Sequence, residues 1–90
     1  MPKPKQMRLL KRAEIMQAKV YTAPNCTWCL KAKSLLDEKN VPYEEIRIGV
    51  DMDKNDFFLF FSSHGVRTVP QIYVDDKYVG DYAELKKFLS

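Results

Sequence analysis

Cysteine, histidine and long hydrophobic runs are scarce in this chain of 90 residues, and each scarcity excludes a class of protein. Two cysteines and one histidine are too few for a structural zinc site, which needs four ligands. One pair of cysteines is also too few for a disulfide scaffold in so small a domain. The longest apolar run, Phe57–Phe61, has five residues, far short of the roughly 20 that cross a membrane. We therefore expect no bound metal ion and no membrane association.

The remaining composition is that of one small globular domain. Apolar residues make up 46% of the chain and charged residues 30%, and the aromatic residues suffice for one modest core. A second domain would usually need about 100 further residues. The basic start of the chain lacks an apolar segment before a small-residue cleavage site, so we expect no secretory leader.

Charge is distributed unevenly along the chain. The net charge is +3, but residues 1–19 carry a net charge of +5 and residues 20–90 a net charge of −2. We interpret residues 1–15 as a basic N-terminal extension and residues 16–90 as the folded domain. A basic arm can contact nucleic acid or an acidic protein surface. Because no nucleic-acid-binding motif accompanies it, we prefer a solvated tail and expect no nucleic-acid partner.

Hydrophobic periodicity predicts elements in the order β-α-β-α-β-β-α. The predicted strands are 18–22, 42–48, 71–74 and 77–80, and the predicted helices are 26–39, 51–64 (ending at Gly65) and a short one from Asp81 to the C-terminus. A strand–helix–strand start implies a parallel pair joined by a right-handed crossover. Asn25 is the candidate N-cap of the first helix. Phe57, Phe60 and Phe61 fall on one stripe of the second helix, and His64, on the same stripe, is expected to be structural.

The two cysteines, Cys26 and Cys29, are separated by two residues and open the first predicted helix. There the sulfur of Cys26 faces unpaired backbone N–H groups and the positive end of the helix dipole, and both favour the thiolate. Cys29 lies almost one turn further along, is expected to be more buried, and can form a disulfide with Cys26. Cys26 is therefore the candidate nucleophile of a thiol–disulfide exchange site, and Cys29 is the candidate resolving thiol. The alternative interpretation is that the two cysteines are half of the ligand set of a split metal site.

A second motif, Arg67-Thr68-Val69-Pro70, precedes the third predicted strand. The residue before a proline favours extended geometry. A cis Val69–Pro70 bond would present the backbone of Val69 to a peptide-like substrate. A trans proline at the start of an edge strand is the alternative. With the cysteine pair upstream, we predict the cis form.

Residues 18–90 resemble a glutaredoxin of the thioredoxin-like superfamily. The resemblance rests on three segments in order: Val20-Tyr21-Thr22 with Cys26-Thr27-Trp28-Cys29, then Thr68–Val74, then Val79–Leu85. The size is similar to that of small bacterial or bacteriophage dithiol forms. The resemblance implies an α/β fold with a four-stranded mixed sheet flanked by three helices. It also implies glutathione as the reductant, and disulfide-containing proteins such as ribonucleotide reductase as partners. We expect a monomer in the cytoplasm.

The resemblance also implies which residues form the site. Cys26 corresponds to the nucleophile and Cys29 to the resolving thiol. The glutathione-binding positions that it implies are Trp28, Arg67, Thr68, Val69, Pro70, Gly80, Asp81, Tyr82 and Glu84. Trp28 stands where the family usually has a tyrosine beside glutathione, and we expect it at the rim of the site. Tyr82 is also expected to serve in packing.

Departures from the family pattern concern the binding of glutathione. Ala23 stands where many members have a lysine or arginine, for which Arg67 is the better candidate substitute and Lys19 the other. Asp81 and Glu84 also fit a capping box for the last helix, so their contact with the γ-glutamyl end is in question. Two alternatives stay open: a glutaredoxin-like protein reduced by a flavoprotein reductase, and a dimer bridging an iron–sulfur cluster through the first cysteine of each chain.

Overall fold

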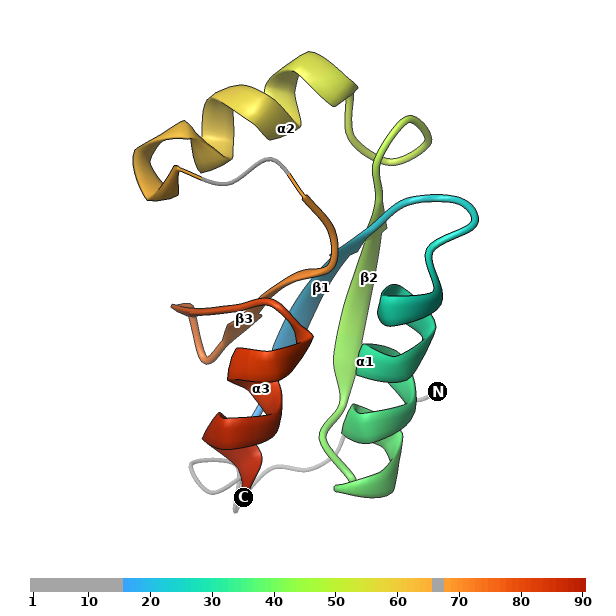
Figure 1. Ribbon diagram of the computed structural model, residues 1–90, viewed down its shortest axis with the longest axis vertical. Coiled ribbons are helices and arrows are strands. Elements are labelled where there is room, and N and C mark those ends of the chain that lie inside the picture. The colour runs from blue at the N-terminus through green and yellow to red at the C-terminus, as the bar shows by residue number, and fades with distance from the viewer. Residues whose placement is uncertain (1–15, 66–67) are drawn as a thin grey trace.

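The computed structural model describes residues 16–65 and 68–90, and its elements follow the predicted order (Figure 1). The strands are β1 (Ala18–Thr22), β2 (Tyr43–Arg47), β3 (Gln71–Val74) and β4 (Lys77–Gly80); the helices are α1 (Thr27–Glu38), α2 (Lys54–Phe61), the short 3₁₀ helix η3 (Ser62–His64) and α3 (Tyr82–Leu89). The basic extension predicted for residues 1–15 lies outside the described residues. Within the described ranges, every helix is too short or too polar to cross a membrane.

The four strands form one mixed sheet in the order β2-β1-β3-β4. The crossover through α1 places β2 parallel to β1, with Val20 opposite Glu45. β3 is antiparallel to β1, and β4 is antiparallel to β3. The predicted four-stranded mixed sheet with three helices is therefore confirmed.

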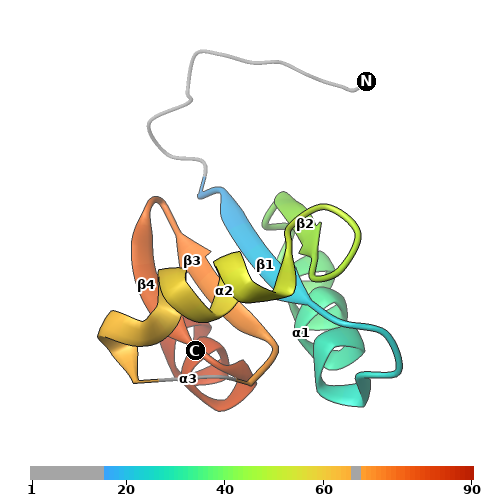
Figure 2. The ribbon, with the colours of Figure 1, turned by 90° about the horizontal axis from the view of Figure 1, so that it is seen from above.

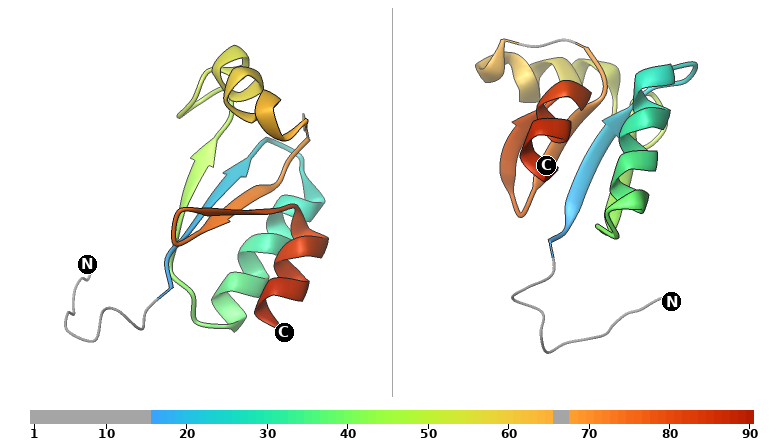
Figure 3. Two further views of the ribbon diagram at one scale, coloured as in Figure 1. Left: turned by 90° about the vertical axis from the view of Figure 1, so that its left-hand side faces the viewer. Right: turned by 60° about the horizontal axis from the view of Figure 1, so that its bottom comes forward.

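The apolar side chains of the central strand β1 point alternately to the two faces of the sheet, and helices pack on both faces. Successive side chains of a strand point to opposite faces. Val20 packs into the cluster that includes Leu36 of α1 and Leu85 of α3, whereas Tyr21 packs with Phe57 of α2. Figure 3 shows α1 and α3 side by side on one face, and Figure 2 shows α2 crossing the other. One short strand thus anchors both cores.

The helix α2 begins later than the predicted span 51–64. Asp51 accepts hydrogen bonds from the backbone N–H and from Nε of Arg47, both at 3.0 Å, and so holds a turn after β2. The helix then starts after Asp53, whose side chain accepts the N–H of Asn55 at 2.9 Å. Asp51, which was predicted to begin the helix, therefore stabilises the turn before it instead.

The predicted aromatic stripe of α2 is only partly buried. Phe57 and Phe61 are 2% and 0% exposed, but Phe60 is 48% exposed, so its placement on the buried stripe was wrong. Each residue advances a helix by about 100°, and a narrow contact with the sheet cannot cover both Phe60 and Phe61. His64 is exposed, and its ring stacks on Tyr78 with the centroids 4.0 Å apart.

The turn between β3 and β4 offers a test of local backbone strain. Asp75 and Asp76 both have positive φ angles, 52° and 67°. A two-residue hairpin of this kind favours glycine at its second position, because an L-side chain is strained there. We expect Asp76→Gly to raise the free energy of unfolding by about 0.5–1 kcal/mol, and Asp76→Ala to lower it. Urea unfolding of both variants measures this, and a less stable glycine variant would contradict it.

Candidate active site

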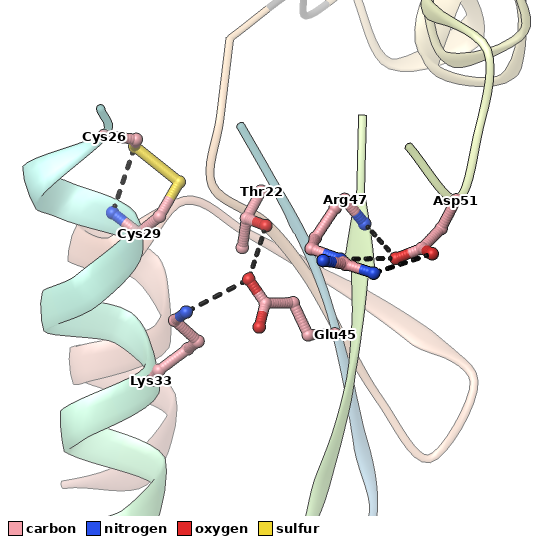
Figure 4. A network of polar contacts seen from close by, with 7 residues as sticks. All are labelled: Thr22, Cys26, Cys29, Lys33, Glu45, Arg47 and Asp51. Atoms are coloured by element: carbon pink, nitrogen blue, oxygen red, sulfur yellow. Dashed lines mark hydrogen bonds and ion pairs between the residues drawn. A yellow bond between two sulfur atoms is a disulfide. The ribbon is translucent and has the colours of Figure 1, made fainter. Parts of the chain in front are cut away.

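The first cysteine is the N-cap of α1. Cys26 has extended backbone angles (φ −109°, ψ 103°), and its Sγ accepts the backbone N–H of Cys29 at an N···S distance of 3.1 Å (Figure 4). The predicted cap, Asn25, instead has a φ of 59° and lies one residue too early. Asparagine tolerates this left-handed conformation in the turn that leads into the helix. A sulfur atom therefore occupies the place where the unpaired N–H groups and the positive dipole end of α1 meet.

Cys26 and Cys29 are joined by a disulfide, with their Cα atoms 5.2 Å apart. Cys29 is 2% exposed because it shares the inward face of α1 with the buried Ala32 and Leu36, whereas Cys26 is partly exposed. The predicted difference in burial between the two cysteines is confirmed. An approaching thiol or disulfide therefore reaches Cys26 first.

The loop before β3 lies directly against the first cysteine. The Val69–Pro70 peptide bond is cis, as predicted, and the carbonyl oxygen of Val69 lies 3.8 Å from Cys26 Sγ. Gln71, which is 1% exposed, donates from Nε2 to the carbonyl of Thr68 at 2.9 Å and accepts a hydroxyl hydrogen bond from β4. This buried amide fixes the loop. Gln71 is not among the predicted site residues, although a glutamine at the first position of an apolar strand is an available signal.

A pocket of about 220 Å³ lies beside this loop, and we call it the Trp28 pocket. The described residues that line it are Trp28, Thr68, Val69, Pro70, Asp81, Tyr82 and Ala83. The structure thus brings six of the nine predicted glutathione-binding positions together around one cavity. Trp28 is 55% exposed, which confirms its predicted place at the rim, and its ring centroid lies 5.5 Å from that of Tyr82. The two rings form one wall of the pocket.

Of the other predicted positions that the structure describes, Gly80 and Glu84 do not line the pocket, and Asp81, which does, is also engaged at the start of α3. Gly80 has a φ of 122°, and a Cβ there would come within 3.0 Å of Glu84 Cγ, so the position requires glycine. The Glu84 carboxylate lies 3.7 Å from the ammonium of Lys87. Asp81 accepts the N–H of Glu84 at 3.2 Å and is the N-cap of α3, which supports the capping interpretation. Arg67 lies outside the described residues.

A polar network that the sequence analysis missed lies below the disulfide. Glu45 of β2 accepts hydrogen bonds from Thr22 Oγ1 at 2.7 Å and from Lys33 Nζ at 3.0 Å (Figure 4). These three residues line a cavity of about 460 Å³ together with both cysteines. The Thr22 hydrogen bond lowers the pKa of Glu45 and the contact with Lys33 adds to this, while burial acts the other way. The lowered pKa favours the carboxylate form of Glu45. In the sequence, this network was signalled only by Lys33, which lies one helical turn after Cys29.

The fold and the site together define a class: a thioredoxin-like protein with a dithiol–disulfide pair at a helix N-terminus and a cis-proline loop beside it. The family model for glutaredoxin matches residues 18–79. The chain belongs to the glutaredoxin family.

Curated relatives agree with this assignment. The chain is 48% identical to glutaredoxin 1 of Rickettsia conorii over 61 residues, which are 68% of this chain and 60% of that protein. It is 35% identical to glutaredoxin 3 of Escherichia coli K12 over 66 residues, which are 73% of this chain and 77% of that one. The matched segment thus spans about 60% of the length of the Rickettsia relative.

Solved structures agree as well. Glutaredoxin 1 of Francisella tularensis, solved as a cacodylate complex, is 31% identical with a TM-score of 0.66, covering 80% of this chain and 90% of that one. A buckwheat glutaredoxin–glutathione complex is 22% identical with a TM-score of 0.70, covering 78% of this chain and 64% of that one. At this identity, the buckwheat protein supports the fold alone.

The network below the disulfide leads to a pH-dependent prediction. We expect Thr22→Val, a nearly isosteric change at a position 2% exposed, to lower the free energy of unfolding by about 1–2 kcal/mol at about pH 7. Because folding lowers the pKa of Glu45, this stabilisation is present above the pKa of the unfolded carboxyl and is lost as the pH falls through the folded pKa. The difference from the wild type should therefore shrink at about pH 3, measured by urea unfolding. Equal destabilisation at both pH values would exclude a role for the charge of Glu45.

Proposed function

We propose that residues 16–90 form a glutathione-dependent dithiol–disulfide oxidoreductase domain, in which Cys26 attacks and Cys29 resolves. The observation that carries this proposal is the position of Cys26 Sγ. It caps α1, accepts the N–H of Cys29 at 3.1 Å and lies 3.8 Å from the Val69 carbonyl. A partly exposed sulfur in contact with helix N–H groups is the arrangement that favours a reactive thiolate.

The first half of the reaction is an attack by Cys26 on a substrate disulfide. In the reduced protein the thiolate of Cys26 forms a bond to one substrate sulfur, and the substrate S–S bond breaks. The departing sulfur leaves as a thiolate and takes a proton from solvent. Since the backbone N–H of Cys29 already points at Cys26 Sγ, the negative charge is stabilised before the attack without further rearrangement.

The second half regenerates the oxidised pair seen in the structure. The thiol of Cys29 loses its proton and attacks Cys26 Sγ, which releases the second substrate thiol and leaves the Cys26–Cys29 disulfide. One glutathione then opens this disulfide by forming a mixed disulfide with Cys26. A second glutathione attacks that bond and leaves as glutathione disulfide, which returns both cysteines to thiols.

The Trp28 pocket is the proposed place for glutathione. Its volume is about 220 Å³, and the backbone of Val69 at its edge can pair with the cysteinyl part of the tripeptide. The ring of Trp28 provides an apolar wall, and the carboxylate of Asp81 provides a partner for the γ-glutamyl ammonium. Disulfide-containing proteins such as ribonucleotide reductase are the proposed partners of a monomer, in a reducing compartment such as the cytoplasm.

One observation favours a second candidate, reduction by a flavoprotein reductase instead of glutathione. Gly80 and Glu84 do not line the Trp28 pocket, and Asp81 is already engaged as the N-cap of α3. Fewer side chains are therefore available for the γ-glutamyl end of glutathione than the family pattern implies. The exchange chemistry at Cys26 would be the same in both cases.

Exchanging the cysteines singly tests the assigned roles. We expect Cys26→Ser to abolish activity, because no sulfur remains at the N-cap of α1 and the remaining sulfur, that of Cys29, is only 2% exposed. Cys29→Ser should keep reduction of glutathione mixed disulfides, which needs one thiol, but lose reduction of protein disulfides, which needs two. Both are measured with glutathione, glutathione reductase and NADPH. An inactive Cys29→Ser beside an active Cys26→Ser would reverse the assignment.

The reductant is tested by supplying each electron source separately. With a protein disulfide as substrate, we expect turnover with glutathione and glutathione reductase, and none with a thioredoxin-type flavoprotein reductase and NADPH. Trp28→Ala should raise the KM for glutathione about tenfold, which corresponds to the loss of one aromatic contact of about 1.4 kcal/mol. Turnover with the flavoprotein alone would instead select the second candidate.

A further inference from the structure

The cavity below the disulfide brings the proposed resolving cysteine and a carboxylate together. We call it the Glu45 cavity; its volume is about 460 Å³, and its described lining includes Cys26, Cys29, Lys33 and Glu45. In Figure 4 the carboxylate of Glu45 lies between β2 and α1, below the two sulfur atoms. Since one water in the liquid takes up about 30 Å³, the cavity has room for several water molecules. Among the described residues, none lines both this cavity and the Trp28 pocket.

The second half of the proposed reaction releases a proton from Cys29. The sulfur must lose this proton as it attacks Cys26 Sγ, because the thiolate is the nucleophile. Cys29 is 2% exposed, so bulk solvent has little access to it. Its own N–H is directed at Cys26 Sγ and does not stabilise a negative charge on Cys29. An acceptor for the proton must therefore come from the walls of the Glu45 cavity.

One oxygen of Glu45 is available for this role. The Thr22 hydroxyl and the Lys33 ammonium both donate to Oε2, at 2.7 and 3.0 Å. Among the described residues, none donates a hydrogen bond to Oε1. The two donors thus hold the carboxylate in the cavity wall, and Oε1 remains an acceptor. Lys33 itself, as an ammonium, has no lone pair to offer.

The charges that face Glu45 keep it ionised. They are Lys33 on α1 and Arg47 on β2, and the guanidinium of Arg47 is also paired with Asp51 at 3.0 Å. The neighbouring strand β1 contributes the neutral Thr22. The Thr22 hydrogen bond and these cations lower the pKa of Glu45, so the carboxylate form is favoured. Because a carboxylate is a weaker base than a thiolate, the proton moves to it only while the attacking sulfur shares its electron pair with the new S–S bond.

We propose that Glu45 accepts, through water in the Glu45 cavity, the proton that Cys29 loses when it attacks Cys26 Sγ. The S–H bond of Cys29 and the bond from Cys26 to the substrate sulfur break, and the Cys26–Cys29 bond forms. The substrate leaves as a thiolate and takes a proton from solvent, while Glu45 returns its proton to solvent. This inference rests on the proposed thiol–disulfide exchange and assigns a base to its second half. Thr22 and Lys33 are positioning residues for that base.

The experiment separates the two halves of the exchange in a single turnover of the reduced protein, without glutathione. The probe is a glycine-rich peptide whose single cysteine is disulfide-bonded to thionitrobenzoate, a good leaving group. Attack by Cys26 on the peptide sulfur releases coloured thionitrobenzoate, and attack by Cys29 then releases the peptide. Absorbance follows the first step. Acid quenching and mass spectrometry follow the loss of the peptide mixed disulfide in the second step.

We expect Glu45→Gln, which keeps an oxygen for Thr22 and Lys33, to slow the second step about hundredfold at about pH 7 without slowing the first. Between about pH 6 and 8, the rate of the second step should rise about tenfold per pH unit in this variant, because hydroxide must replace the carboxylate. In the wild type it should change by less than about twofold over the same range. The first step, if not slowed, also shows that the variant is folded.

Glu44→Gln is the matched control. It removes the same charge from the same strand, but Glu44 is exposed and does not line the Glu45 cavity. This variant should match the wild type in the rates of both steps and in the pH profile of the second.

The inference is overturned if the second step keeps its rate in Glu45→Gln or becomes faster. A faster step is what electrostatics alone predicts, because Lys33 would then stabilise the Cys29 thiolate without an opposing charge. An equal fall in both steps, or a slower second step with the wild-type pH profile, would indicate a structural role and would also overturn it. A failure of the proposed function is distinguishable, since the wild type would then release no thionitrobenzoate or would keep the mixed disulfide.

Discussion

The arrangement of this protein depends on a sulfur atom that replaces the usual oxygen at a helix N-cap. Most caps satisfy a backbone N–H with a hydroxyl or carboxylate. Here Cys26 Sγ accepts the N–H of Cys29, and the same atom is the proposed nucleophile of the exchange reaction. The helix is therefore held in place by the group that reacts, so its N-terminal turn must accommodate the sulfur both in a disulfide and as a thiolate.

Strand geometry explains why the neighbouring elements meet at this sulfur. β1 runs into the loop before Cys26, and β3 starts after the cis Val69–Pro70 bond that lies beside it. Because β1 and β3 are adjacent and antiparallel, the last residues of β1 and the first residues of β3 lie side by side at the same end of the sheet. The buried amide of Gln71 then fixes the loop.

The sequence was most informative where local chemistry decides the structure. The spans of β1, β3 and β4 were predicted to the residue, since short β-prone runs are bounded there by proline, acidic pairs and glycine. It was less informative where two local options compete. Asp51 and Asp53 both offered a helix start, and only the tertiary turn formed with Arg47 decides between them. The choice of Cys26 over Asn25 as N-cap was likewise a one-residue competition.

The same distinction applies to the site. The cysteine pair and the Thr68-Val69-Pro70 segment could be located from their spacing in the sequence, and the structure places Val69 beside Cys26. Glu45 could not, because its importance comes from Thr22 on the neighbouring strand and Lys33 on α1, and nothing in the order of residues joins these three.

The position of Trp28 has a practical consequence for following this protein in solution. It is the single tryptophan of the chain and immediately precedes Cys29 in the sequence. Its side chain is half-exposed, with the Lys31 ammonium 4.7 Å from its ring centroid. The indole emission of the whole molecule therefore originates beside the two sulfurs. Opening and closing of their bond becomes an optical signal that needs neither a dye nor a coupled enzyme.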